Sequence, residues 1–175
     1  MTHRQHALPA WLEPVRAGAE EVTGDDLTRF LPPDDADPRR GAVLMLFTGD
    51  DEESGGLLLT ERAHHMRSHP GQVSFPGGSI DPGESPVEAA LREAEEETGL
   101  DPAGVRVFGE LPDLYLPPSN FAVTPVLGWW ETPSPVTSAA PARTGSSQAG
   151  RPGCRLVTGG SRGAARRGRR AGPRS

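Results

Sequence analysis

The chain has 175 residues, no lysine and a formal net charge of −6 at pH 7. This length allows one domain with a hydrophobic core, and the single cysteine, Cys154, excludes an internal disulfide framework and a cysteine-based metal site. No apolar run approaches the roughly 20 residues that cross a membrane, and the first residues lack the layout of a signal peptide. We therefore expect a soluble, cytoplasmic protein.

Charge divides the chain into two parts. Residues 1–136 hold nine arginines and all 24 acidic residues, a net charge of −15, whereas residues 137–175 hold nine arginines and no acidic residue, a net charge of +9. We interpret residues 1–34 as an N-terminal extension, residues 35–136 as the folded domain and residues 137–175 as a tail of low complexity.

The first predicted elements are a short helix and a hairpin. A helix around Asp25 to Phe30 is expected, with Thr23 or Asp25 as its cap. The continuous apolar run from Ala42 to Phe47 predicts a strand buried on both faces. A polar, glycine-rich stretch follows, and residues 57–61 read as the returning strand, so the two strands form a hairpin that begins a mixed sheet.

Two arginines follow this hairpin and precede the glycine pair Gly77-Gly78. Arg62 and Arg67 suit an anionic, phosphate-bearing ligand, because guanidinium groups match phosphate oxygens in a bidentate manner. The alternative is that both are isolated surface arginines. Three histidines in the same stretch have a spacing that fits no common zinc pattern, although a catalytic base or a phosphate contact remains open for one of them: His64, His65 and His69.

The next predicted element is a helix with well-defined ends. Ser85 is a capping residue, Pro86 suits the first helical position, and Glu88 can reach back to the cap. Gly99 is suited to the left-handed conformation that ends a helix. An apolar stripe at three- and four-residue spacing predicts one buried face; its members are Val87, Ala90, Leu91 and Ala94.

The other face of this helix is acidic. Glu93, Glu96 and Glu97 are three and four residues apart, so their carboxylates share one patch near the C-terminal half, where the helix dipole disfavours anions. A hard divalent cation such as Mg²⁺ or Mn²⁺ would offset this cost and would accept oxygen ligands. The alternative is an ordinary solvated acidic face.

Two further strands are expected before the tail. Apolar and polar residues alternate over residues 105–111, which predicts a strand. Residues 114–121 are expected to form a proline-stiffened loop. Residues 122–130 are expected to form another strand, in which Pro125 suggests an edge or a bulge. Residues 137–175 contain only Leu156 and Val157 as large aliphatic residues and no aromatic residue. Such a segment cannot bury enough apolar surface to offset its ordering entropy, so we expect it to be disordered.

The stretch from Gly78 to Leu100 reads Gly-x5-Glu-x7-Arg-Glu-Ala-x-Glu-Glu-x-Gly-Leu, and this resembles the signature of the Nudix hydrolases at all nine fixed positions. The resemblance implies an α/β/α sandwich around a mixed sheet and metal-dependent hydrolysis of a nucleoside diphosphate linked to another moiety, with Mg²⁺ or Mn²⁺ as cofactor. It implies that Glu93 and Glu97 are the main metal ligands and that Glu96 is a further ligand or the base. Arg92 and Glu84 would form a pair that orients these carboxylates; the alternative is a surface ion pair of little energetic worth.

Residues 58–78 carry a second pattern, Leu-Leu-Thr-x-Arg-Ala-x3-Arg-x3-Gly-x3-Phe-Pro-Gly-Gly, which looks like the motif of the coenzyme A pyrophosphatase branch of that family. This resemblance implies cleavage of coenzyme A or its derivatives to 3′,5′-ADP and 4′-phosphopantetheine or an acyl form. Arg62 and Arg67 would contact substrate phosphates, while Gly77 and Gly78 would let the backbone approach the metal. Tyr115 could stack on adenine or only cover the core.

Several alternatives stay open. Another substrate, such as ADP-ribose or a dinucleoside polyphosphate, would use the same signature, and an impaired remnant could bind nucleotide without turnover. The partner expected is a small-molecule substrate, with no specific nucleic acid and no membrane, and a homodimer is open. The branch normally continues with a strand and a long helix that close the sandwich, and neither is visible after residue 136. A shifted reading frame would explain this, and the alternative is a genuine basic tail that binds anions or nucleic acid nonspecifically.

Overall fold

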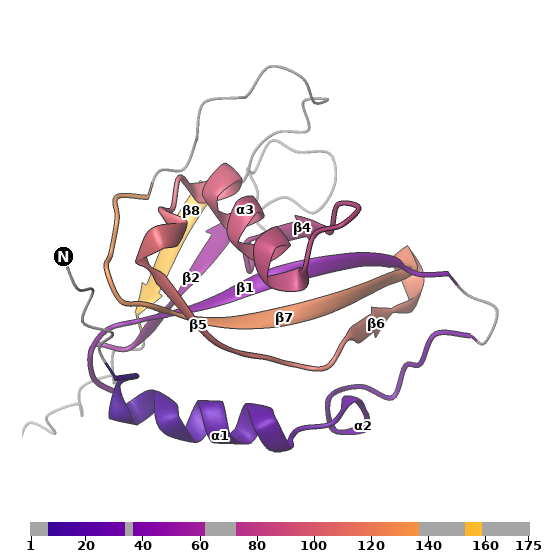
Figure 1. Cartoon of the computed structure of the whole chain (residues 1–175), viewed down its shortest axis with the longest axis horizontal. Helices are drawn as coiled ribbons and strands as arrows, with labels where there is room; N and C mark the ends of the chain where they lie inside the picture. Colours follow the sequence, from indigo (N-terminus) through magenta and orange to yellow (C-terminus); the bar gives the residue numbers. More distant parts are fainter. Residues whose placement is uncertain (1–6, 34–36, 62–72, 137–152, 159–175) are drawn as a thin grey trace, which may run out of the picture.

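The computed structural model describes residues 7–33, 37–61, 73–136 and 153–158. Within these ranges, one mixed sheet of eight strands is flanked by helices (Figure 1). The strands are β1 Arg39–Thr48, β2 Gly56–Glu61, β3 Val73–Ser74, β4 Gly77–Ser79, β5 Val105–Glu110, β6 Leu114–Leu116, β7 Phe121–Trp130 and β8 Gly153–Thr158. The helices are α1 Glu13–Glu21, α2 Gly24–Leu27 and α3 Pro86–Thr98, with 3₁₀ turns at Ala10–Leu12, Pro102–Gly104 and Pro117–Ser119.

Strand β1 is at the centre of the sheet. It runs parallel to β7, in register from Arg39 opposite Phe121 to Phe47 opposite Trp129. On its other edge β1 has two antiparallel partners: β2 pairs with the C-terminal end of β1, and β4 pairs with the N-terminal part of β1. Strands β5 and β6 flank β7, and β3 and β8 flank β2. The predicted hairpin and mixed sheet are confirmed.

Alternating residues of β1 bury two separate faces of the sheet. Leu44 and Leu46 are fully buried in one core cluster that also holds Ala90 and Ala94 of α3. Phe47 points the other way and packs in a second cluster with residues that precede or begin α1 and with Trp129 of β7. Figure 1 shows α3 and α1 on opposite sides of the sheet. The expected α/β/α sandwich is therefore confirmed.

Helix α3 begins and ends where its sequence predicts. The Ser85 hydroxyl accepts a hydrogen bond from the Glu88 N–H at 3.2 Å, and the Glu88 carboxylate accepts from the Ser85 N–H at 2.8 Å. Gly99 ends the helix with φ of +73°. Ala90 and Ala94 are buried, so this helix is fixed against the sheet along its apolar stripe and presents its glutamates on the remaining surface.

The N-terminal extension holds more helix than expected. The prediction missed α1, in which Arg16 pairs with Glu13 at 2.8 Å and with Glu20 at 2.6 Å. The short helix that was predicted is α2, which begins at Gly24 and already ends at Leu27; Thr23 is its cap. None of the helices in the described ranges is long and apolar enough to cross a membrane.

Two expectations about the strands after α3 are wrong. Residues 114–116, expected in a loop, form the strand β6, which pairs with β7. Pro125 lies neither at a sheet edge nor in a bulge of its own strand, because β7 has β1 on one side and β5 and β6 on the other. Proline is tolerated because β7 changes partner at this point. The pairing with β5 extends to Val126 and the pairing with β6 starts at Val123, so Pro125 lies between the two pairings. On that edge of β7 the missing N–H therefore breaks no ladder hydrogen bond.

The expectation that no strand follows residue 136 is also wrong. Strand β8 pairs antiparallel with β2 along its whole length, from Gly56 opposite Thr158 to Glu61 opposite Gly153. The physical reason is that strand pairing uses the backbone, so it does not need the apolar content on which the prediction of disorder depended. The rest of the tail lies outside the described residues.

Candidate active site

The glycine pair of β4 and the acidic face of α3 meet at one place. A Cβ atom added to Gly78 would overlap the carboxylate of Glu93, with Oε2 at 2.8 Å and the carboxyl carbon and Oε1 closer still. The backbone N–H of Gly77 donates to Oε2 of Glu97 at 3.4 Å. Two carboxylates on successive turns of α3 therefore lie against two successive residues of β4.

Gly77 is required for a different reason. A Cβ atom at this position would overlap the carbonyl oxygen of Ala42 and would lie 2.7 Å from the Cα of Val43, both on β1. The close approach of β4 to β1 thus excludes a side chain at Gly77, and the close approach of Glu93 excludes one at Gly78. The two glycines are therefore required by two separate contacts: Gly77 by the packing of β4 on β1, and Gly78 by the Glu93 carboxylate in the candidate site.

Arg92 holds the glutamates in place. Its Nε and Nη2 donate to the two oxygens of Glu84, each at 2.9 Å, and Nη2 also donates to the carbonyl of Ser79 at 3.0 Å. The hydrogen bond from Arg92, aided by the Asp81 N–H, lowers the pKa of Glu84 from 4.5 to about 2. The same bond raises the pKa of Arg92 above its ordinary value. Both groups are therefore charged at neutral pH.

Arg92 also contacts the acidic face itself. Its Nη1 donates to Oε1 of Glu93 at 2.9 Å and lies 3.9 Å from Oε1 of Glu96. The side chain of Glu93 is 21% exposed, whereas that of Glu96 is 48% exposed. Glu93 and Glu97 thus face β4, and Glu96 lies at the solvent side of the same patch. The positive charge of the Arg92 guanidinium partly offsets the repulsion among these carboxylates.

The donor set fits Mg²⁺ or Mn²⁺ bound together with a substrate. In the described part of the chain, no three acidic, histidine or cysteine side chains are gathered as a closed metal site. Mg²⁺, however, usually takes one or two carboxylates and completes its shell with water and substrate phosphates. Glu93 and Glu97 would supply the carboxylates, and the glycine at position 78 gives the Glu93 carboxylate the space to lie against β4.

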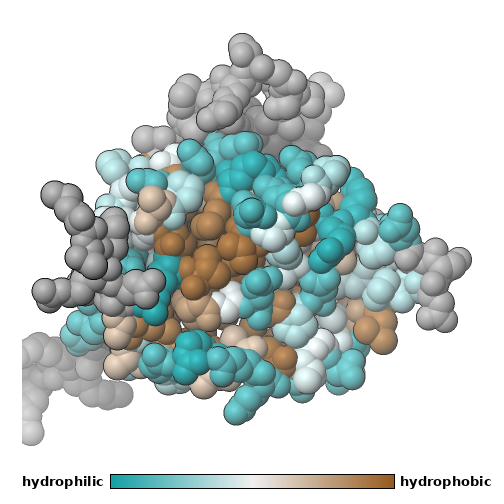
Figure 2. Space-filling view, in the orientation of Figure 1, coloured by the Kyte–Doolittle hydropathy of each residue, from teal (hydrophilic) through white to brown (hydrophobic). Residues whose placement is uncertain are grey.

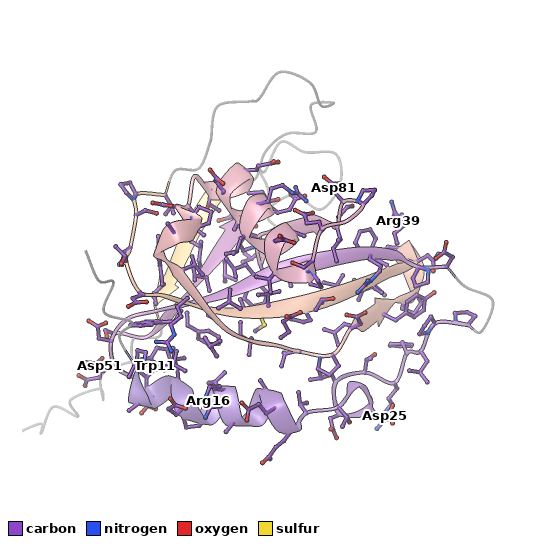
Figure 3. All side chains as sticks on the ribbon, viewed as in Figure 1. Trp11, Arg16, Asp25, Arg39, Asp51 and Asp81 are labelled. Carbon is purple, nitrogen blue, oxygen red and sulfur yellow. The ribbon has the colours of Figure 1, made fainter. Side chains whose placement is uncertain are left out.

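The last residue of β4 and the loop that follows it contribute two groups that sequence reasoning missed. The carbonyl of Ser79 accepts from Arg92, and the N–H of Asp81 donates to Glu84 at 3.0 Å. Both are backbone groups, so the identity of the residue gives no signal from which the contact could be predicted. Figure 3 shows Asp81 at the same end of the molecule as Arg39, where β1 begins.

The remaining predicted site residues fall outside the described ranges. These are Arg62 and Arg67, together with His64, His65 and His69. Their roles stay predictions. The described residues that flank them are joined, because Thr60 of β2 pairs with Ser74 of β3 and its hydroxyl lies 3.1 Å from the Ser74 hydroxyl.

Comparison with known proteins gives consistent results. The family model described as NUDIX domain matches residues 38–133. The chain is 41% identical over 101 residues to Nudix hydrolase 3 of Caenorhabditis elegans, covering 58% of this chain and 41% of the relative. It is 45% identical over 116 residues to a protein of Enterobacter sp. (strain 638) named uncharacterized Nudix hydrolase NudL, covering 62% of this chain and 59% of the relative. The chain therefore spans about half the length of these relatives.

A solved structure shows the same fold. The Nudix hydrolase RenU from M. smegmatis matches with a TM-score of 0.50 and 24% identity, covering 69% of this chain and 70% of that chain. At this level of identity the likeness concerns the arrangement of the sheet and helices.

Proposed function

Because the chain belongs to the Nudix family, we propose that it hydrolyses the diphosphate of coenzyme A or an acyl derivative. Water attacks one phosphorus atom, the anhydride P–O bond breaks, and the products are 3′,5′-ADP and 4′-phosphopantetheine or its acyl form. The proposed cofactor is Mg²⁺ or Mn²⁺, held by Glu93 and Glu97 with Glu96 as a further ligand or the base.

The approach of Glu93 and Glu97 to the glycine pair is the observation that carries the hydrolase chemistry. An ordinary solvated acidic face would project its carboxylates away from the protein, but here Glu93 fills the space that a side chain at position 78 would need. When bound, a divalent ion neutralises diphosphate charge and makes a nearby water more acidic. The chain supplies two carboxylates that lie against the glycine pair of β4.

The positioning of these carboxylates is the task of Arg92 and Glu84. The two-point contact between them fixes the guanidinium, and the guanidinium in turn holds the carboxylate of Glu93. If Glu96 is the base, its carboxylate at the exposed side of the patch accepts a proton from a water that approaches from solvent. Its carboxylate would then release that proton to bulk water after the anhydride bond has broken.

The second sequence motif supports coenzyme A as the substrate. Its first part, Leu58 to Thr60, lies in β2, and its last part leads into β4 at Gly77. The pairing of Thr60 with Ser74 brings these two parts together beside the glycine pair. Arg62 and Arg67, which the motif assigns to substrate phosphates, lie between them in the sequence. We also propose that the protein is cytoplasmic and that its partner is a small-molecule substrate.

A substrate panel tests the proposal. The full chain is incubated with Mg²⁺ or Mn²⁺ and either coenzyme A, ADP-ribose or a dinucleoside tetraphosphate, and the products are separated by chromatography. We expect 3′,5′-ADP from coenzyme A and a kcat/KM at least tenfold higher than for the other two. Faster turnover of ADP-ribose or the dinucleotide would contradict the substrate. A rise in melting temperature with coenzyme A but no turnover would identify a binding protein instead.

A further inference from the structure

Two consecutive arginines begin β1 and stand on opposite faces of the sheet. Arg40 is two residues from Ala42, which packs in the core under α3, so Arg40 stands on the face that α3 covers. It forms a loose ion pair with Asp113 at 3.9 Å. Arg39 stands on the other face, and no carboxylate of the described residues pairs with it. The two arginines therefore differ both in the face they occupy and in their partners.

Arg39 is held in place by three consecutive residues. Its backbone N–H donates to the carbonyl of Asn120 at 3.0 Å, and its Nη2 donates to the carbonyl of Ser119 at 3.2 Å. Its guanidinium carbon lies 4.8 Å from the centre of the Phe121 ring. Because a guanidinium has five N–H donors, most of them remain for another acceptor. A side chain that is already held in this way loses little freedom when a ligand binds.

The candidate active site lies at the outer edge of β4. The N–H of Gly77 donates to Glu97, and the carbonyl of Ser79 accepts from Arg92. The N–H of Ile80, in contrast, donates to β1. Backbone groups alternate between the two edges of a strand, so Gly77 and Ser79 direct theirs away from β1, and β1 is the partner of β4 in the described ranges. Figure 2 shows mainly hydrophilic surface around the loop that follows β4 in Figure 1. A polar ligand held at this edge can extend to either face of the sheet.

The face that carries Arg39 has no side chain between Arg39 and this edge at one position, Gly41. Gly41 is opposite Ser79 of β4. A Cβ atom at Gly41 would overlap the Phe121 ring and would lie 2.7 Å from the carbonyl oxygen of Gly78. Phe121 is level with Arg39 in the register, so its ring leans from there toward β4. The ring and the guanidinium on it therefore adjoin the strand that carries the candidate site.

The separation suits the 3′-phosphate of coenzyme A. One strand spacing across and two residues along β1 place the Cα of Arg39 roughly 8 Å from that of Ser79. In coenzyme A, six covalent bonds join the 5′ phosphorus to the 3′ phosphorus, a reach of at most about 7 Å. With the diphosphate at the edge of β4, the 3′-phosphate comes within reach of the Arg39 side chain.

Charge favours a phosphate as the group that Arg39 binds. Residues 1–136 carry a net charge of −15, so a phosphate away from the metal is repelled unless a cation faces it. A guanidinium matches phosphate oxygens and stays charged throughout the physiological range. ADP-ribose and dinucleoside polyphosphates carry an uncharged hydroxyl at the 3′ position, which would gain less from this contact.

We propose that Arg39, held on the Phe121 ring, binds the 3′-phosphate of coenzyme A and so selects coenzyme A over nucleotides with a 3′-hydroxyl. This inference rests on the proposed function and names a residue that determines its substrate. The 3′-phosphate takes no part in breaking the anhydride bond, so the contact stabilises bound substrate and transition state alike. It should therefore act on KM and not on kcat.

The test compares coenzyme A with 3′-dephospho-coenzyme A in the full chain. For the wild type we expect a kcat/KM at least about tenfold higher for coenzyme A, with the difference in KM. Arg39→Gln should bring the ratio of the two values close to one. Arg39→Lys keeps the charge without the planar geometry and should give an intermediate ratio. Arg40→Gln is the matched control, because Arg40 is the neighbouring arginine on the other face, and it should keep the wild-type ratio.

A binding measurement separates this contact from catalysis. The nucleotides 3′,5′-ADP and 5′-AMP differ only in the 3′-phosphate, and in the presence of EDTA the first should raise the melting temperature of the wild type more than the second. Arg39→Gln should abolish the excess, and Arg40→Gln should retain it.

Two results would overturn the inference and leave the proposed function intact. One is an equal kcat/KM for the two substrates in the wild type. The other is a fall by the same factor for both substrates in Arg39→Gln, which would mean that Arg39 only holds residues 119–121 in place. If the wild type cleaves neither substrate, the proposed function itself fails, and the melting comparison still decides whether Arg39 binds a 3′-phosphate.

Discussion

Alanine at Gly78 and alanine at Gly77 should have opposite consequences. The Cβ added at Gly78 meets the carboxylate of Glu93, which is the far end of a flexible side chain. Glu93 can yield, so the fold should tolerate the change. The Cβ added at Gly77 meets the backbone of Ala42 and Val43, and these atoms can yield only if β4 moves away from β1.

The magnitudes follow from the contacts. In Gly78→Ala, a separation of 2.8 Å between the new Cβ and Oε2 of Glu93 must widen to an ordinary contact, which displaces the carboxylate by at least about 0.6 to 1 Å. Displacements of about 1 Å in an active site can cost about 100-fold in rate, so we expect kcat/KM to fall by about that factor. In Gly77→Ala, overpacking costs about 1 to 3 kcal/mol of unfolding free energy.

The assay measures both properties for each variant. Activity is followed with coenzyme A at saturating Mg²⁺, and stability by thermal unfolding, for which about 1 kcal/mol corresponds to roughly 2 to 4 °C. Gly109→Ala is the control, since its added Cβ meets its nearest neighbour at an ordinary 3.4 Å. Full activity in Gly78→Ala, or a loss of stability as large as that of Gly77→Ala, would refute the reasoning about Glu93.

Three further changes test the site and the helix that carries it. Glu97→Gln should lower kcat by at least about 100-fold in Mg²⁺ while the melting temperature stays within about 2 °C, because the amide oxygen can still accept from Gly77; unchanged turnover would remove Glu97 from the ligands. The pKa of Glu84 is lowered to about 2, so its pairing with Arg92 stabilises the fold above pH 4.5 and is lost as pH falls toward 2. The difference in melting temperature between wild type and Glu84→Gln should therefore be constant above pH 5 and shrink below it, and a difference that grows on acidification would contradict the assignment. Ser85→Ala should cost about 1 kcal/mol in a denaturant titration, and no loss would mean that the cap does not hold α3.

The ends of α3 could be predicted because single residues determine them. Ser85 and Glu88 satisfy the first backbone N–H groups, and Gly99 adopts a conformation that other residues resist. The glutamates could be predicted to share a patch because helix geometry fixes their spacing. Their approach to Gly77 and Gly78 could not, since it depends on how closely β4 and α3 meet.

The missed elements lack such local signals or carry weak ones. Strand β6 has three residues and runs directly into Pro117, so its hydrophobic pattern is too short to recognise. Strand β8 forms because β2 offers an open edge, which is a property of the sheet and not of residues 153–158. Helix α1 did carry a signal, the spacing of Arg16 from Glu13 and Glu20, which its proline and glycine obscured.

Binding of Mn²⁺ tests the central claim most directly. Calorimetric titration in the presence of coenzyme A compares the wild type with the double variant Glu93→Gln/Glu97→Gln, after thermal unfolding has shown that both chains are folded. We predict saturable binding to the wild type and a loss of at least about tenfold in affinity in the variant. Equal affinity in the two proteins would show that these carboxylates hold no cation.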